Sequence, residues 1–251
     1  MKFSESWLRT FVNPTIDTQS LCDLLTFGGI EVEAVAPVAP AFDRVVVAEV
    51  LEVEKHPNAD RLNLCKVNVG DAVLSIVCGA PNVKVGIRVP AALVGAQLPE
   101  MKIKAAKVRG VDSAGMLCSA RELGLDNGVD GLWILSPNAT IGMNLRQALS
   151  LDDNIIDIKA TPNRGDCLSL LGLAREVSAL GDCALNIPFD TNPVSVKQTK
   201  PQAIEIKALE ACPRYCARPI HGVNPKAPTP DWMVERLARS GVRSISAIVD
   251  V

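Results

Sequence analysis

Turn-forming blocks divide the first half of the chain into short runs with β-strand character. In the first block, Pro57-Asn58 follows the apolar run Val45–Val53. Proline fixes φ and asparagine bonds to nearby backbone groups, so we expect the strand to end at this point. A β pattern resumes at Leu62. The sequence therefore predicts that His56–Asp60 is an exposed loop between two strands.

Two further blocks continue this alternation. Gly79–Asn82 ends the expected strand Ala72–Cys78 in the same way. Gly115-Met116-Leu117-Cys118-Ser119 leads into Ala120-Arg121-Glu122, and the S-x-x-E spacing is that of a capping box. We therefore expect a short helix from Ser119 to near Gly124. Short strands, Gly/Pro turns and one capped helix over residues 39–150 predict a small closed barrel.

The three blocks, in this order and spacing, resemble the tRNA-binding OB-fold module of several aminoacyl-tRNA synthetases and their accessory proteins. The surrounding sequence is similar to the β subunit of bacterial phenylalanyl-tRNA synthetase. The segments that carry this second resemblance are Met1–Leu8, Gly28–Glu33, Thr161–Ser169, Gly172–Val177, and Arg214-Tyr215 with Ile220, Gly222 and Val223 behind it. The resemblance runs from one end of the chain to the other.

Apolar periodicity and caps predict the elements around the barrel. The expected helices are Ser4–Val12, Thr18–Phe27 capped by Asp17, Ser169–Leu180, and a helix through Arg239 that starts at Thr229-Pro230; the expected strands are Ile30–Val35, Ile155–Ile158, Ala203–Ile206 and Ser244–Val251. The elements on either side of the barrel are too few to fold separately. We therefore expect one small α/β domain into which the barrel is inserted.

The resulting fold class is α+β and multi-domain. We expect residues 1–38 and 151–190 to form the two parts of the small α/β domain, and the resemblance implies that residues 39–150 form an OB-fold tRNA-binding barrel. Residues 191–201 are a linker. The resemblance implies that residues 202–251 are the start of an α/β editing domain of the B3/B4 type, which we expect to be incomplete because the chain resembles a truncated piece of a longer subunit.

Composition limits how such a chain can bind nucleic acid. The 251 residues carry a formal net charge of −2, so the molecule offers no broad positive field to a polyanion. Only one Tyr, five Phe and three Trp are present, which argues against a stacking platform for single strands. Any contact with RNA must come from a local basic patch, and we expect no DNA partner.

The eight cysteines are mostly isolated within apolar runs, and only Cys212 and Cys216 are close in sequence. With two histidines in the chain, this spacing favours reduced, buried thiols over a zinc site.

The polar Ser4-Glu5-Ser6 start is unlike a signal peptide, and the longest apolar runs are too short to span a membrane. We expect a soluble, cytoplasmic protein that has no membrane partner.

The run Met101–Arg109 concentrates four cations without an acid: Lys102, Lys104, Lys107 and Arg109. We expect Lys102 and Lys104 on one face of a strand, where they can contact neighbouring phosphates. The alternative is a solvated edge strand that its lysines protect from aggregation. Arg121, at the start of the capped helix, is a further candidate for a phosphate contact.

His56 and Asn58 lie in a loop of the kind that OB folds use for ligands, which makes them candidate RNA contacts. The alternative is a hydrogen-bonded turn. Ser119 and Glu122 are better explained as a cap than as a contact.

Motifs that would indicate catalysis do not occur in the sequence: there is no phosphate-binding G-x-x-x-x-G-K-[ST] loop and no recognisable Ser/His/Asp or paired-carboxylate grouping. We expect no catalytic residue, metal or bound cofactor in this chain. The resemblance implies that ATP and Mg²⁺ serve the whole enzyme, whose α subunit charges tRNA(Phe) within an α2β2 heterotetramer. We therefore expect the chain alone neither to charge tRNA nor to hydrolyse tyrosyl-tRNA.

Two alternatives remain open at this level. A free-standing tRNA-binding OB protein would share residues 39–150 but lack Thr161–Leu180 and Arg214–Val223, which this chain has. A general single-strand-binding OB protein would need more aromatic residues than are present here.

Overall fold

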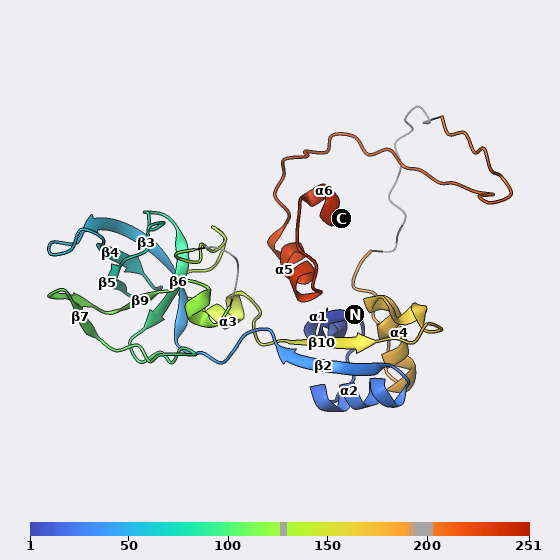
Figure 1. Ribbon diagram of the computed structural model, residues 1–251, viewed down its shortest axis with the longest axis horizontal. Helices are drawn as coiled ribbons and strands as arrows, with labels where there is room; N and C mark the ends of the chain where they lie inside the picture. The colour runs from blue at the N-terminus through green and yellow to red at the C-terminus, as the bar shows by residue number, and fades with distance from the viewer. Residues whose placement is uncertain (126–129, 191, 193–202) are drawn as a thin grey trace.

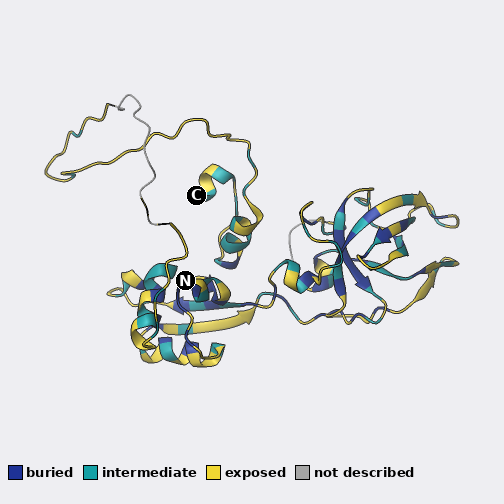
Figure 2. Ribbon diagram, turned by 180° about the vertical axis from the view of Figure 1, so that it is seen from behind, coloured by how far each residue is buried: buried dark blue, intermediate teal, exposed yellow. Residues whose placement is uncertain are grey.

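The computed structural model describes residues 1–125, 130–190, 192 and 203–251 (Figure 1). A small α/β domain and a β-barrel lie side by side, and a largely extended C-terminal segment ends in two short helices. Buried residues gather inside the barrel and between the sheet and the helices of the α/β domain (Figure 2). The linker expected at residues 191–201 lies outside the described residues, apart from residue 192.

The α/β domain is built on a three-stranded antiparallel sheet in the order β1-β10-β2. These strands are β1 (Lys2–Ser4), β10 (Asn154–Lys159) and β2 (Glu31–Pro37). The barrel comes between β2 and β10 in sequence, yet β10 is the central strand of the sheet. The inserted barrel that the fold class predicted is therefore confirmed.

Three helices cover this sheet, and each is capped by the side chain of the residue before it. They are α1 (Glu5–Phe11), α2 (Thr18–Phe27) and α4 (Leu170–Leu180). The backbone N–H of Trp7 donates to Ser4 Oγ, that of Ser20 to Asp17 Oδ1, and that of Gly172 to Ser169 Oγ, at 3.1, 2.8 and 3.0 Å. Each bond satisfies one N–H group that the first turn of a helix leaves unpaired.

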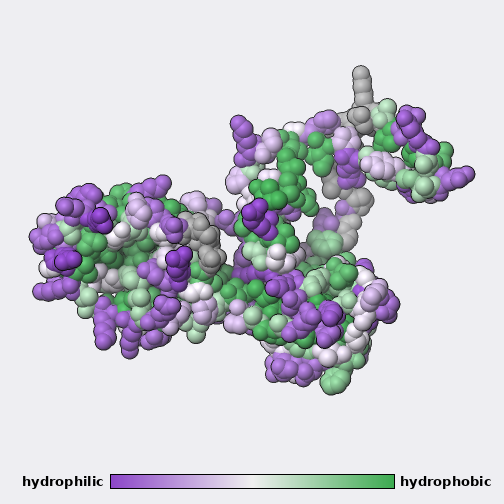
Figure 3. All heavy atoms as spheres, viewed as in Figure 1, coloured by the Kyte–Doolittle hydropathy of each residue, from purple (hydrophilic) through white to green (hydrophobic). Residues whose placement is uncertain are grey.

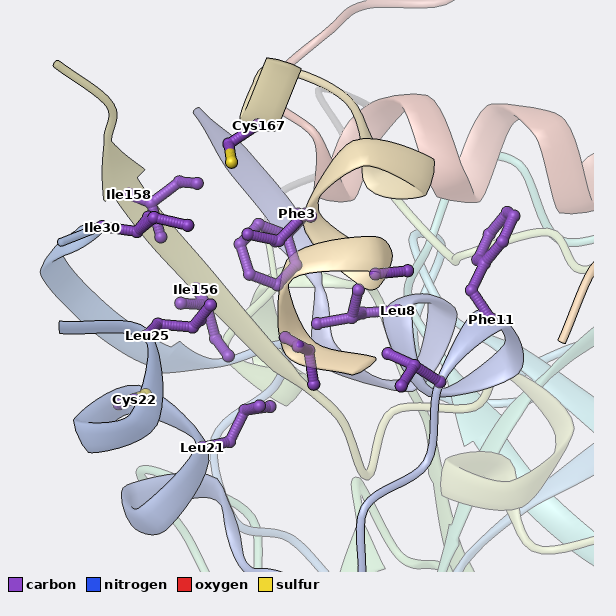
Figure 4. Packing of buried hydrophobic residues seen from close by; sticks show 14 residues of the cluster. Phe3, Leu8, Phe11, Leu21, Cys22, Leu25, Ile30, Ile156, Ile158 and Cys167 are labelled. Carbon is purple, nitrogen blue, oxygen red and sulfur yellow. The ribbon is translucent and has the colours of Figure 1, made fainter. Parts of the chain in front are cut away.

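The core of the α/β domain brings together both parts of the sequence (Figure 4). Phe3, Leu8 and Leu25 from the first part pack with Ile156 and Leu173 from the second, and all five are essentially inaccessible to solvent. Neither part holds a complete apolar core by itself.

The barrel is a nearly closed five-stranded antiparallel sheet in the order β5-β4-β3-β6-β9. Its strands are β3 (Val45–Lys55), β4 (Asn63–Asn68), β5 (Val73–Cys78), β6 (Arg88–Leu93) and β9 (Gly115–Leu117). An irregular register between Val50 and Glu52 lets β3 pair with β6 along its first half and with β4 along its second. The N–H of Ala114, next to β9, donates to the carbonyl oxygen of Ser75 on β5 at 2.9 Å, which helps to close the barrel.

Smaller elements complete this region. A hairpin is formed by β7 (Ala106–Val108) and β8 (Val111–Ser113). Two short helices also belong to the barrel region, η1 (Arg121–Leu123) and α3 (Leu145–Ala148). A third, η2 (Gly165–Cys167), follows β10 in the α/β domain. The expected helix at Ser119 is thus a single 3₁₀ turn. Its capping box is present, because the N–H of Ser119 donates to Glu122 Oε2 at 2.6 Å and the N–H of Glu122 donates to Ser119 Oγ at 3.3 Å.

Two strand predictions for the C-terminal segment are wrong. Ala203–Ile206 has no regular structure, and Ser244–Val251 contains the short helix α6 (Ala247–Asp250). The Asp250 carboxylate accepts hydrogen bonds from Ser244 Oγ at 2.6 Å and from the N–H of Ile245 at 2.8 Å, which folds the apolar run back on itself. A third bond comes from Thr229 Oγ1 at 2.6 Å. The helix expected to start at Thr229-Pro230 begins at Asp231 and has no side-chain cap.

Helix α5 (Asp231–Arg239) packs on the α/β domain through two arginines. Arg239 is almost fully buried, and its Nη1 donates to Asp153 Oδ2 at 2.8 Å. Its Nη2 donates to the carbonyl oxygens of Leu149 and Ser150 at 3.0 and 2.9 Å. The guanidinium carbon of Arg236 lies 4.8 Å from the ring centre of Trp7, in cation–π contact.

None of the described helices has the length and apolar character needed to cross a bilayer.

Candidate nucleic-acid interface

The basic run 101–109 does not form one strand, contrary to the sequence-based expectation. Lys102 makes only an isolated bridge with Gln97, and regular pairing begins at Ala106. The N–H of Ile103 donates to the carbonyl oxygen of Ala96 at 2.8 Å, and the N–H of Leu98 donates to that of Met101 at 2.8 Å. The backbone around Lys102 is therefore held by residues 95–98.

Lys102 and Lys104 are nevertheless both accessible. Ile103 between them is buried in the barrel core, whereas the two lysines are exposed. Hydrophilic side chains cover much of the barrel face visible in the space-filling view (Figure 3). The two lysines can therefore meet a polyanion without any rearrangement of the core.

The second half of the run forms one arm and the tip of the β7–β8 hairpin. Val108 pairs with Val111, which leaves Arg109-Gly110 as a two-residue loop. The φ angles of Arg109 and Gly110 are +50° and +89°. Positive values at both positions are typical of the type I′ turn, whose twist suits a tight hairpin. Arg109 is exposed at this turn.

Lys107 lies on β7 and is also exposed. Its Nζ is 3.9 Å from Asp112 Oδ1, and both side chains are largely in solvent, with 73% and 84% of their surface exposed. An exposed pair at this distance contributes little to stability. Lys107 can therefore exchange Asp112 for a phosphate at little cost.

His56 is not exposed, contrary to expectation: only 5% of its surface is accessible. Its Nδ1 accepts a hydrogen bond from the N–H of Asn58 at 3.1 Å. Since Nδ1 is an acceptor, Nε2 carries the proton and donates to the carbonyl oxygen of Val108 at 3.0 Å. The sequence could not show this burial, because the partner is a backbone group far away in the chain.

Asn58 contacts the same hairpin. Its Nδ2 donates to the carbonyl oxygen of Arg109 at 3.1 Å, while much of its surface remains exposed. The structure thus brings His56 and Asn58 into contact with the backbone of the turn that carries Arg109 and follows Lys107. Arg121 belongs to a different element, η1, where its side chain is exposed.

Val108 is a residue that sequence reasoning missed at this interface. It contributes through its carbonyl oxygen, a group that every residue has, so its side chain carries no signal of the role. The pairing of two valines around Arg109-Gly110 was the available indication of a tight hairpin, because a two-residue loop with glycine in second place is typical of type I′ turns.

Within the described residues, one group of side chains has the composition of a metal site: Asp166, Cys167 and Glu176 offer ligand atoms within 4.8 Å of one another. Arg164 bridges the two carboxylates, with Nε 3.3 Å from Asp166 Oδ1 and Nη2 2.7 Å from Glu176 Oε2. Hydrogen bonding to Arg164 lowers the pKa of Asp166, so this carboxylate is committed to the guanidinium. The arrangement is that of an ion-pair network.

The buried cysteines of the barrel core are also poorly suited to bind a metal ion or to act as nucleophiles. Burial raises the pKa of the Cys65 thiol to about 11 and that of Cys118 to about 12. Both thiols therefore stay protonated near neutral pH, and the thiolate is the form that binds metals and attacks substrates.

Two domain families match the chain. Residues 45–144 match the family described as "Putative tRNA binding domain", which corresponds to the barrel and its hairpin. Residues 211–251 match the B3/4 domain. The barrel is thus similar to a family of tRNA-binding domains, and it is followed in sequence by a segment that is similar to the B3/4 domain.

Several curated proteins match this chain over its entire length, and they are phenylalanine–tRNA ligase β subunits. The chain is 57% identical over 254 residues to the phenylalanine–tRNA ligase β subunit of Dechloromonas aromatica, and 57% identical over 253 residues to that of Aromatoleum aromaticum. Each match covers 100% of this chain and 32% of the relative, so the chain spans about a third of the length of these curated proteins. The chain is a homologue of the N-terminal region of phenylalanine–tRNA ligase β subunits.

A solved structure, the C-terminal domain of Plasmodium vivax p43, is 26% identical to this chain and covers 40% of it, whereas 57% of that domain is covered. The TM-score is 0.30, which is too low to support a structural argument.

Proposed function

We propose that the chain serves as the N-terminal region of the β subunit of a phenylalanine–tRNA ligase. In this role it binds tRNA(Phe) and contributes to assembly with the α subunit in an α2β2 enzyme of the cytoplasm. The α subunit would carry out ATP- and Mg²⁺-dependent charging. The observation that carries this proposal is the 57% identity over the entire chain, with the tRNA-binding family and the B3/4 family in sequence order.

The alternative of a free-standing tRNA-binding OB protein is less well supported. Such a protein would match its relatives only through the barrel. Here the matches cover 100% of the chain, including the α/β domain that surrounds the barrel and the region 211–251.

The proposed contact with tRNA is electrostatic and local. Lys102, Lys104, Lys107, Arg109 and Arg121 are exposed cations of the barrel region, in a chain whose net charge is −2. Binding of phosphates by these side chains releases counterions, so the affinity depends strongly on salt concentration.

The test measures affinity for a tRNA(Phe) transcript over a range of salt concentrations. The test variant replaces Lys102, Lys104, Lys107 and Arg109 by alanine, and we expect weaker binding. The slope of log K against log salt should flatten by roughly 0.7–0.9 for each phosphate that the variant no longer binds. The control replaces two exposed cations of the α/β domain, Lys159 and Arg175, and should leave the slope unchanged. Unchanged affinity and slope in the test variant would exclude the basic run as the binding site.

A further inference from the structure

The tip of the β7–β8 hairpin is supported by the loop that contains His56 and Asn58. Two successive carbonyl groups at the start of its turn accept hydrogen bonds from side chains of that loop: Val108 from His56 Nε2 at 3.0 Å and Arg109 from Asn58 Nδ2 at 3.1 Å. The N–H of Asn58 donates to His56 Nδ1 at 3.1 Å, which orients the imidazole. The loop and the turn therefore form one hydrogen-bonded unit.

This turn requires such support. Its strands, β7 and β8, have three residues each, and a two-stranded hairpin of this size is marginally stable alone. The N–H of Val77 on β5 donates to Ser113 Oγ on β8 at 3.1 Å, which attaches the base of the hairpin to the barrel at the end opposite the turn. Arg109 also has a φ of +50°, a conformation that is unfavourable for a residue with a Cβ atom. The position that a Cβ on Gly110 would occupy lies 3.6 Å from Asn58 Nδ2, so the asparagine packs directly against the turn.

We propose that His56 and Asn58 are positioning residues for RNA recognition, which hold the Arg109 turn in a fixed conformation and do not themselves contact the RNA. This inference rests on the proposed function, because Arg109 must bind a phosphate for its position to matter. The sequence left two interpretations of His56 and Asn58, direct RNA contacts and a hydrogen-bonded turn, and the proposal follows the second of them.

The other half of the basic run supplies a matched control. Lys102 lies in the same sequence segment and is exposed, but its backbone is held by residues 95–98 instead of the His56 loop. A change at Asn58 should therefore alter the contribution of Arg109 and leave that of Lys102 intact.

The experiment is a pair of double-mutant cycles on the 251-residue chain, with a tRNA(Phe) transcript as the probe. The single variants are Asn58→Ala, Arg109→Ala and Lys102→Ala, and the double variants combine Asn58→Ala with each of the other two. Removal of one phosphate contact should weaken binding about five- to tenfold at 0.1 M salt. We expect Asn58→Ala to reproduce part of the loss caused by Arg109→Ala, and the Asn58/Arg109 double variant to bind no more weakly than Arg109→Ala.

With Lys102 the expectation is different, because the fold losses of Asn58→Ala and Lys102→Ala should multiply. His56→Gln provides a second test, since the glutamine amide can replace only one of the two bonds that the imidazole makes. Amide exchange at Val108 and Val111 should be faster in both Asn58→Ala and His56→Gln, and this readout does not depend on RNA binding.

Three outcomes would overturn the inference. If the reductions in affinity caused by Asn58→Ala and Arg109→Ala multiply, Asn58 is an independent RNA contact. If Asn58→Ala binds as tightly as the unmodified chain while Arg109→Ala binds more weakly, the loop does not position the turn. In either case the proposed function stands. If Arg109→Ala has no effect on affinity, the hairpin is not an RNA contact and the basic-run proposal itself is weakened.

Discussion

At the scale of single residues, serine and aspartate caps were the most predictable features. Asp17 caps α2 as predicted, and Ser169, the first residue of an expected helix, caps α4, because a cap depends only on residues two or three positions away. His56 shows the opposite case, since its burial depends on a carbonyl group 52 residues further along. Local sequence determines the first kind of contact, and only the closed barrel creates the second.

The capping box at Ser119 provides a prediction at this scale. Ser119→Ala removes the oxygen that accepts from the N–H of Glu122 and donates to its carboxylate at 2.8 Å. We expect a loss of about 1 kcal/mol in the free energy of unfolding, with tRNA affinity almost unchanged. Denaturant unfolding and a binding titration on the same preparation would measure both. A large loss of affinity without a change in stability would show that Ser119 contacts RNA.

At the scale of elements, strand predictions held in the barrel and failed near the C-terminal end. β3 and β5 begin and end within about two residues of the predicted bounds, because turns fix their ends and neighbouring strands pair with them. Ser244–Val251 has the same apolar, β-branched composition but is folded by the Asp250 carboxylate. Composition indicates that a segment favours a strand, whereas pairing decides whether it forms.

The Asp250 turn should be sensitive to acid. Hydrogen bonds from Ser244, Thr229 and Ile245 lower the pKa of Asp250 to about 2. A carboxyl group whose pKa is lower in the folded state contributes stability above its unfolded pKa, and this contribution is lost as pH falls toward the folded value. We expect amide exchange around α6 to accelerate between about pH 4 and about pH 2 beyond its intrinsic trend.

Asp250→Asn is the matched variant for this prediction. It should show fast exchange in α6 already at neutral pH, and its protection should then vary little over the same acid range. Equal protection of the variant and the unmodified chain at neutral pH would mean that the carboxylate does not hold the turn.

At the scale of the whole molecule, the sheet of the α/β domain depends on residues from both sides of the barrel. Deletion of residues 1–38 removes β1 and β2, which are both neighbours of β10, together with α1 and α2. We expect residues 154–180 to unfold in this truncation while the barrel strands keep their amide protection. Hydrogen exchange would decide the point. Retained protection in Leu170–Leu180 would indicate an independently folded second part.

The paired strands β2 and β10 also determine how force is transmitted between the α/β domain and the barrel. Pro37 and Asn154 are register partners, and the N–H of Val38 donates to the carbonyl oxygen of Asp153 at 2.9 Å, so both connections to the barrel leave the sheet side by side. A domain joined by two adjacent connections resists rotation about its own axis far more than one joined by a single connection. Arg239 donates a hydrogen bond to Asp153, which lies where one of these connections enters the sheet. Torque that a bound polyanion exerts on the barrel would therefore act on the central strand β10 and on α5 together.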